Sequence, residues 1–158
     1  MTVKTKASPA EPLSKTRLRL WLKLLKASNR IEEEIRRKLR DEYQSTLPRF
    51  DVMSALFRYS DGLKMSEISE LLRVSNGNIT GIVDRLTQEG LAVRVAVPGD
   101  RRASLVRLTN TGRAAFADHA AAHEEWIDGL LGGLSADDTE GMSHRLDKLI
   151  HSLEEPKA

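Results

Sequence analysis

The sequence predicts a mostly α-helical chain that carries one small β-hairpin. Three observations lead to this fold class. Apolar residues recur at helical spacing over long stretches at both ends of the chain. Two short central segments alternate apolar and polar residues, as half-buried strands do, and Pro98-Gly99 supplies a turn between them. We therefore expect long helices that flank a compact unit with a hairpin.

The first 60 residues predict a terminal arm and two helices. Residues 1–13 are polar and contain two prolines, a composition typical of a disordered arm. A long helix is expected from Ser14 to about Gln44, and a second from Pro48 to about Ser60, where Asp61-Gly62 ends it. The long helix carries one stripe near helical spacing, formed by Trp21, Leu24, Ser28, Ile31, Ile35 and Leu39.

Residues 65–109 predict a helix, a tight turn, a second helix and the hairpin. Ser66 is the expected N-cap of the first helix, and Ser75 or Asn76 that of the second, which Gly90 ends. The strands are expected at residues 91–95 and 105–109, with residues 98–102 as their link. This order of elements is typical of a winged helix-turn-helix, whose second helix fits the major groove of DNA.

The last part of the chain predicts two more helices. An Ala-rich helix should run from Asn110 to about Leu131, where Gly132-Gly133 breaks it. Ser135 with Asp138 resembles a capping pattern for the final helix, which places Met142, Leu146, Leu149 and Leu153 on one side. We expect residues 14–47 and 110–158 to form a dimerisation region around a DNA-binding region at residues 48–109. A monomeric helical bundle joined to a winged domain is the alternative.

Composition limits the compartment and the partners. The 158 residues include no cysteine, no apolar run long enough for a membrane span and no N-terminal apolar signal core, so a cytoplasmic protein is expected. The net charge of +2 conceals an asymmetry. Residues 1–40 hold twelve Lys and Arg against four Glu, and residues 114–158 hold three against ten Asp and Glu. These ends could lie against one another, within or between subunits, or form independent solvated faces.

DNA contacts are expected from the second helix, from its approach and from the tip of the hairpin. Asn pairs with adenine, Thr contacts base edges, and arginines suit a narrow minor groove. Gly81 would let the backbone approach DNA, unless it is only a tolerated surface residue. Asp100 should orient an arginine or cap the turn, and Arg94 and Arg107 should form ion pairs within the fold. The expected DNA-binding residues are Lys64, Ser66, Ser75, Asn76, Gly77, Asn78, Thr80, Gly81, Arg85, Arg101 and Arg102.

The hairpin also carries a family resemblance. The segment from Asp100 to Thr109 resembles the D-x-R…L-T wing signature of the multiple antibiotic resistance regulator (MarR) family, with Arg102 as the motif arginine. Gly90-Leu91 and Arg94 before the wing, and Thr109 and Gly112 after it, match the same pattern. The resemblance spans roughly residues 16–153. It implies a homodimeric DNA-binding regulator, usually a repressor that a small ligand releases from a pseudo-palindromic operator.

The resemblance further implies an effector site between the dimer-forming helices and the winged region. Its candidate residues are Trp21, Ser28, Arg49, Phe50, Met53, Phe57 and Trp126. An aromatic pocket with one arginine suits an aromatic carboxylate or its thioester, and the basic first helix could hold the phosphates of coenzyme A. Residues 17–21 and 47–51 look similar to members that sense aromatic acids or aromatic acyl-CoA compounds. Ordinary core and surface is the alternative.

Other function classes have less support in the sequence. No Gly-rich phosphate loop and no Ser/His/Asp grouping is present, so neither an enzyme nor a bound cofactor is expected. His119 and His123 lie four residues apart beside Glu124, a spacing that can hold a metal in a metal-responsive regulator, although two histidines on a solvated face are more common. A helical protein-interaction module without DNA binding is a further alternative, which the basic hairpin disfavours.

Overall fold

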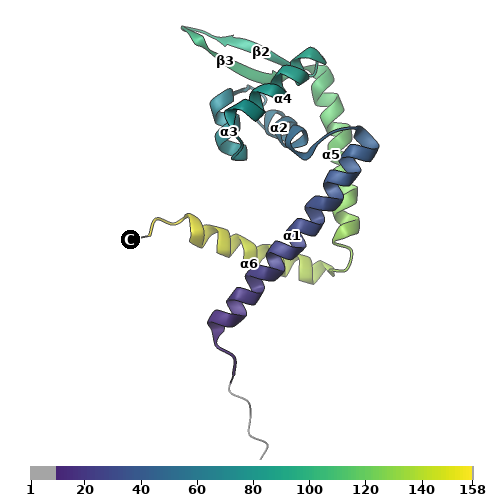
Figure 1. The fold of residues 1–158 in the computed structure, drawn as a ribbon, viewed down its shortest axis with the longest axis vertical. Helices are drawn as coiled ribbons and strands as arrows, with labels where there is room; N and C mark the ends of the chain where they lie inside the picture. The colour runs from purple at the N-terminus through teal and green to yellow at the C-terminus, as the bar shows by residue number, and fades with distance from the viewer. Residues whose placement is uncertain (1–9, 158) are drawn as a thin grey trace, which may run out of the picture. The chain divides into compact units, whose positions relative to one another are not determined.

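The computed structural model describes residues 10–157, and the chain divides into two compact units after Leu47. Among its described residues, the first unit contains helix α1 (Leu13–Tyr43). The second holds α2 (Leu47–Arg58), β1 (Leu63–Lys64), α3 (Met65–Leu72), α4 (Asn76–Gln88), β2 (Ala92–Val97), β3 (Asp100–Leu108), α5 (Asn110–Leu130) and α6 (Ala136–Glu154) (Figure 1). The predicted fold class, mostly helical with a small hairpin, is confirmed. Most of the predicted arm lies outside the described residues.

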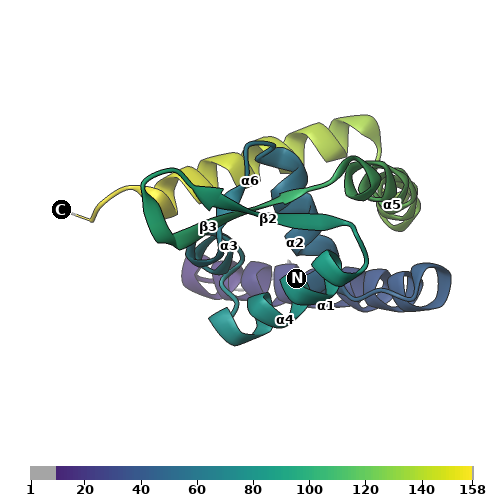
Figure 2. The ribbon, with the colours of Figure 1, turned by 90° about the horizontal axis from the view of Figure 1, so that it is seen from above.

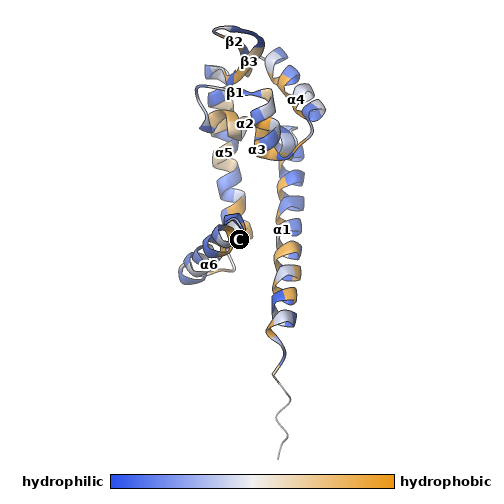
Figure 3. Ribbon diagram, turned by 90° about the vertical axis from the view of Figure 1, so that its left-hand side faces the viewer, coloured by the Kyte–Doolittle hydropathy of each residue, from blue (hydrophilic) through white to orange (hydrophobic). Residues whose placement is uncertain are grey.

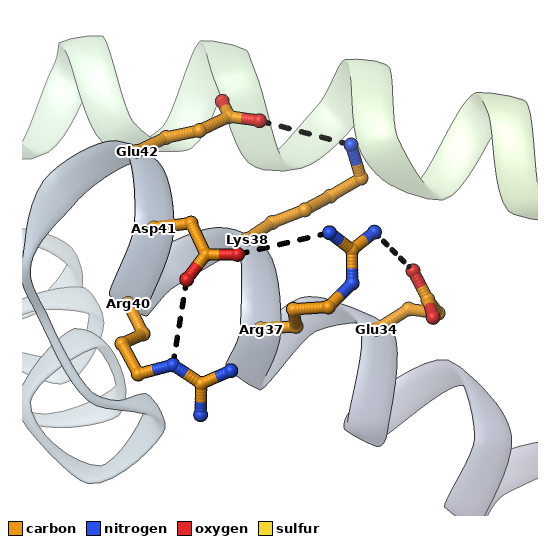
Figure 4. Close-up of polar contacts among 6 residues, drawn as sticks. All are labelled: Glu34, Arg37, Lys38, Arg40, Asp41 and Glu42. Atoms are coloured by element: carbon orange, nitrogen blue, oxygen red, sulfur yellow. Dashed lines mark hydrogen bonds and ion pairs between the residues drawn. The ribbon is translucent and has the colours of Figure 1, made fainter.

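Helix α1 is one uninterrupted helix of 31 residues. Ion pairs one turn apart support its C-terminal half: Glu34 contacts Arg37 at 2.7 Å, Arg37 contacts Asp41 at 3.7 Å, and Lys38 contacts Glu42 at 3.7 Å (Figure 4). The hydrogen bond and charge of Arg37 lower the pKa of Glu34. Because water and salt screen pairs on the surface of a helix, each pair adds little to its stability.

The three strands form one antiparallel sheet in the order β1-β3-β2. Leu63 of β1 pairs with Val106 of β3, and Ala92 of β2 pairs with Leu108. Strand β1 was not expected, because two residues are too short to show alternation. Residues 100–102, predicted as part of the link between the strands, belong to β3. The link is therefore only Pro98-Gly99, where Gly99 takes a left-handed φ of 84°.

Helices α3 and α4 pack against one face of this sheet (Figure 2). Side chains alternate along β3, so Val106 and Leu108 are buried while Arg107 between them is exposed. The core of the second unit is completed by fully buried side chains from the helices, namely Val52, Met53, Leu56, Ile68, Ile79, Val83 and Leu86. Among helices of residues 10–157, none is long and apolar enough to cross a membrane.

Side chains at the helix starts confirm two predicted caps and correct one. The Ser75 hydroxyl accepts a hydrogen bond from the Asn78 N–H at 3.4 Å, and the Ser135 hydroxyl accepts one from the Asp138 N–H at 3.1 Å. Ser66 is not the cap of α3. Since β1 runs directly into the helix, Lys64 takes that position, and its N–H donates to the Glu67 carboxylate at 3.1 Å.

The wing joins α5 through a junction centred on Thr109. Its hydroxyl donates to the Gly90 carbonyl at 2.7 Å and accepts from the Gly112 N–H at 3.0 Å. Its own N–H donates to the Leu91 carbonyl at 3.0 Å. A Cβ added at Gly112 would lie 1.9 Å from that same carbonyl oxygen. The start of α5 therefore touches the backbone at the start of the wing, and only glycine allows that approach.

Apolar side chains stay exposed on two helices of the single chain. Leu18 and Trp21 of α1 are each 57% exposed, and Figure 3 shows apolar residues recurring along the N-terminal half of that helix. Helix α6 has no buried residue, and its exposed apolar side chains are Met142, Leu146, Leu149, Ile150 and Leu153. Both helices thus present an apolar face that could bury further surface.

Gly112→Ala is expected to destabilise the protein by at least about 2 kcal/mol, because the new methyl group would overlap backbone that cannot move without breaking the Thr109 junction. Gly129→Ala, on the same helix with open space around the added Cβ, should instead raise stability by up to about 1 kcal/mol. Urea unfolding of both variants measures the difference. Equal stability of the two would contradict the close approach.

Candidate nucleic-acid interface

Helix α4 presents one polar face to solvent. Ile79, Val83 and Leu86 are buried on its other face and fix the helix on the sheet unit. The predicted reading residues of this helix are all exposed: Asn76, Gly77, Asn78, Thr80, Gly81 and Arg85. The apolar periodicity of the sequence therefore predicted correctly which face of the helix is exposed. That face carries amide, hydroxyl and guanidinium groups that can pair with base edges.

Two hydroxyl groups on this face also serve the helix itself. Thr80 donates its hydroxyl hydrogen to the Asn76 carbonyl at 2.8 Å, and the Ser75 hydroxyl accepts from Asn78. The Thr80 side chain keeps its methyl group and an oxygen lone pair for a base. The start of α4 is thus fixed before any partner arrives.

The hairpin is irregular at the point where its arginines lie. Ala96 pairs with Ser104, but the next residue, Val97, pairs with Asp100. The residues 101–103 therefore form a bulge, which redirects side chains relative to a regular strand. Arg101 and Arg102 in this bulge are exposed. The Asp100 carboxylate accepts a hydrogen bond from the Arg102 N–H at 3.0 Å, as predicted for a residue that caps the turn.

A groove of about 390 Å³ connects the wing with the two helices of the helix-turn-helix. It is lined by Lys64, Met65, Ser66, Asn76, Arg102, Ala103 and Ser104. Four of the predicted DNA-binding residues, from separate elements, therefore meet in one groove whose lining includes no carboxylate. Sequence reasoning missed Ser104, because it began the second strand at residue 105 and so overlooked the position two residues after Arg102.

Two arginines on the strands of the wing differ in whether they form an ion pair. Arg94 forms an ion pair with Asp84, the one carboxylate on the exposed face of α4, which confirms the predicted role of Arg94 within the fold. Arg107 was expected to form a similar pair, and this was wrong: among residues 10–157 it has no acidic partner. The pairing with Arg94 screens the negative charge of Asp84 on a face that would meet phosphates.

The predicted effector residues of the second unit lie around an aromatic cluster between α2 and α5. The ring of Phe116 lies 5.4 Å from that of Phe50 and 5.0 Å from that of Phe57, while His123 lies 4.8 Å from Phe50. Met53 is fully buried in the core, and Phe50 and Trp126 are also buried, whereas Phe57 is 36% exposed. Trp21 and Ser28 belong to the first unit, where both are exposed on α1.

Two ionisable groups next to this cluster, Arg49 and His119, already interact with other groups of the protein. Arg49 forms an ion pair with Glu89, and its hydrogen bond lowers the pKa of that carboxyl. Burial lowers the pKa of His119, which favours the neutral imidazole. Within the part of the chain that the structure describes, no three His, Cys, Asp or Glu side chains come together as metal ligands would. His123 packs its ring on Phe50 instead.

Comparison with known proteins identifies the winged unit. Residues 48–127 match the family model of the winged helix DNA-binding domain. The multiple antibiotic resistance protein MarR of Escherichia coli is 30% identical over 121 residues, which cover 72% of this chain and 81% of the relative.

Solved structures agree with this match. The crystal structure of a MarR family transcriptional regulator from Silicibacter pomeroyi aligns with a TM-score of 0.74 and 30% identity, over 91% of this chain and 99% of the other. A mutant MarR from E. coli complexed with operator DNA shares the fold, with a TM-score of 0.68 and 23% identity over 88% of this chain and 99% of that one. These relatives are transcriptional regulators and not enzymes. The chain belongs to the MarR family of winged-helix DNA-binding regulators.

Proposed function

We propose that this chain is a cytoplasmic, homodimeric transcriptional repressor that leaves a pseudo-palindromic operator when a small effector binds. The observation that carries the DNA-binding part is the groove in which Lys64, Ser66, Asn76 and Arg102 converge beside the exposed face of α4. Residues 48–109 would form the DNA-binding region, with residues 14–47 and 110–158 as the dimerisation region.

In this proposal α4 enters the major groove and the wing enters the adjacent minor groove. Asn76, Asn78, Thr80 and Arg85 would contact base edges, because their side chains are exposed and polar. Lys64, Ser66 and Ser75 would hold phosphates and fix the register. Arg101 and Arg102 would lie in the minor groove, where a narrow channel attracts guanidinium groups.

The exposed apolar faces of α1 and α6 support a dimer. Leaving the leucines of a 19-residue helix in water forgoes about 25 cal/mol for each Å² of apolar surface that could be buried. A second copy offers the same faces, and the basic N-terminal half of the chain complements the acidic C-terminal part. Two copies of one reading helix would then bind two half-sites, and the operator complex of the E. coli relative supports such a role.

Footprinting on the DNA upstream of its own gene should give two protected half-sites about one helical turn, or roughly 10 bp, apart. A single half-site protected by a monomer would rule out the dimeric operator.

Arg102→Ala should weaken binding about tenfold or more at constant salt, most clearly on A/T-rich flanks, because a minor-groove guanidinium is lost. Fluorescence anisotropy over a salt series measures this loss, and affinity should fall steeply with salt as counterions are released.

Gly81 supports a close approach of α4 to DNA. It lies inside a 13-residue helix, where glycine costs about 1 kcal/mol relative to alanine. An added Cβ would meet nothing within 4 Å, so no contact within the described residues requires glycine there. Its φ is not left-handed either. Open space for a partner is a physical reason for glycine at this exposed position, and it supports the predicted close approach.

Gly81→Ala is therefore expected to raise the free energy of unfolding by about 1 kcal/mol and to weaken operator binding by about tenfold or more, since the methyl group fills the space that DNA would use. Urea unfolding and fluorescence anisotropy on one preparation separate the two effects. If the variant is more stable and binds DNA like the parent, the backbone of α4 does not approach the duplex closely.

We propose an aromatic acid or an aromatic acyl-CoA as the effector, bound by Trp21, Ser28, Arg49, Phe50, Met53, Phe57 and Trp126. The aromatic cluster of α2 and α5 supports this class, and Phe57 is the most exposed of its phenylalanines. Because Arg49 already holds Glu89, the effector carboxylate would have to share that guanidinium. The cations of α1 would take the phosphates of the coenzyme A form. A ligand that links both regions could alter the spacing of the two reading helices.

Calorimetry with benzoate and benzoyl-CoA should detect binding that weakens in Phe57→Ala, and anisotropy should show that each bound compound lowers operator affinity. Arg58→Gln, an exposed neighbour outside the cluster, serves as the control. Tight binding that leaves DNA affinity unchanged would remove the regulatory role. Absence of binding across a panel of aromatic acids and thioesters would remove the ligand class.

A further inference from the structure

A second basic groove lies on the other side of the wing. Its volume is about 360 Å³, and it is lined by Ser60, Val93, Arg107, Leu108, Thr109, Asn110 and Arg113. Val93 and Arg107 are register partners on β2 and β3, and their chain neighbours Ala92, Val106 and Leu108 are buried. Since side chains alternate across a sheet, Val93 and Arg107 project from the face opposite α3 and α4. The groove is therefore distinct from the one that faces DNA in the proposed function.

The positive charges of this groove have no carboxylate partner among the described residues. Both Arg107 and Arg113 line it, and no carboxylate does. Neither forms an ion pair with a residue that the structure describes, whereas Arg49 and Arg94 of the same unit each hold a carboxylate. Two guanidinium groups in one groove repel each other, and an anion between them would be attracted to both and so offset that repulsion.

The side chain of Arg113 is held for such a role. Its guanidinium lies over the Phe57 ring, 4.6 Å from the centroid, in a cation–π contact. The side chain is half-buried, so it is not a freely moving surface group. This contact uses the face of the guanidinium carbon, and a guanidinium can bind a carboxylate or phosphate through two N–H groups at its edge.

The other walls indicate the size and character of the guest. Val93 is 38% exposed and gives an apolar surface, while Ser60 and Asn110 add a hydroxyl and an amide. The volume lies near the lower end of the range for small-molecule sites, roughly 300 to 1,000 Å³. We propose that this groove binds a small-molecule oxyanion, a carboxylate or phosphate monoester on a compact apolar body, through Arg107 and Arg113.

Such a guest would connect elements that the Thr109 junction already brings together. Arg107 is on β3, Arg113 is in the first turns of α5, and Val93 is on β2. No residue proposed to bind the effector lines this groove, although the Phe57 ring of the aromatic cluster holds Arg113.

The test uses ¹⁵N-labelled full-length protein and three probes: benzoate, phenyl phosphate and the uncharged benzamide. Titration should shift the amide signals of Val93, Leu108 and Asn110 with both anions but not with benzamide. Arg107→Gln and Arg113→Gln should each weaken anion binding about tenfold, the effect of losing one charge-assisted hydrogen bond. Arg113→Lys should restore only part of the affinity, because a lysine lacks the planar fork. Arg58→Gln, exposed and outside the groove, should bind like the parent.

Several results would overturn the site. These are shifts confined to the signals around Phe50 and Trp126, equal shifts with benzamide, or unchanged affinity in both glutamine variants. A fourth is that neither anion binds while the glutamine variants lose affinity for operator DNA. The groove would then contact a phosphodiester and not a small molecule. Urea unfolding curves that match the curve of the parent protein would show that a variant loses binding without losing its fold.

Discussion

The second unit depends on the hydrogen bonds of one threonine. Thr109 ends the wing and caps α5, and its hydroxyl also reaches back to Gly90, 19 residues earlier. Because β3 passes into α5 with no loop between them, this junction sets the angle at which the helix leaves the sheet. Gly112 completes it, since any larger residue would strike the Leu91 carbonyl. The family resemblance at Thr109 and Gly112 thus has a steric origin.

The groove between the wing and the helix-turn-helix follows from the same sheet. Lys64 reaches it because β1 pairs with β3, which places the start of α3 beside the wing. Arg102 reaches it because the bulge after Asp100 shifts the hairpin out of regular alternation. Lys64 and Arg102 are far apart in the sequence, and the pairing of β1 with β3 brings them together.

Local signals in the sequence predicted most of this fold, and non-local contacts account for what was missed. The periodicity of α4 correctly gave its exposed face, and Ser75 and Ser135 were recognisable as caps. Two-residue β1 has no periodicity to detect, so the sequence indicates Ser66 and not Lys64 as the cap of α3. The bulge at residues 101–103 interrupts the alternation of β3, so the sequence indicates a start at residue 105 and does not reveal Ser104. The Arg49–Glu89 pair joins residues 40 positions apart, which no local pattern could indicate.

Five arginines of the second unit fall into two groups that differ in what balances their charge. Arg49 and Arg94 hold carboxylates and so support the fold, whereas Arg102, Arg107 and Arg113 have no carboxylate partner among the described residues. The unpaired ones line grooves on opposite sides of the wing, and two of them, Arg102 and Arg107, lie on the same strand. An anion held on one side would stiffen the strand that presents Arg102 on the other. Such a guest can change DNA affinity only if it binds a DNA-competent and a DNA-incompetent state of the chain with different affinity. The hydrogen bonds of the Thr109 junction limit how far the wing can differ between two such states.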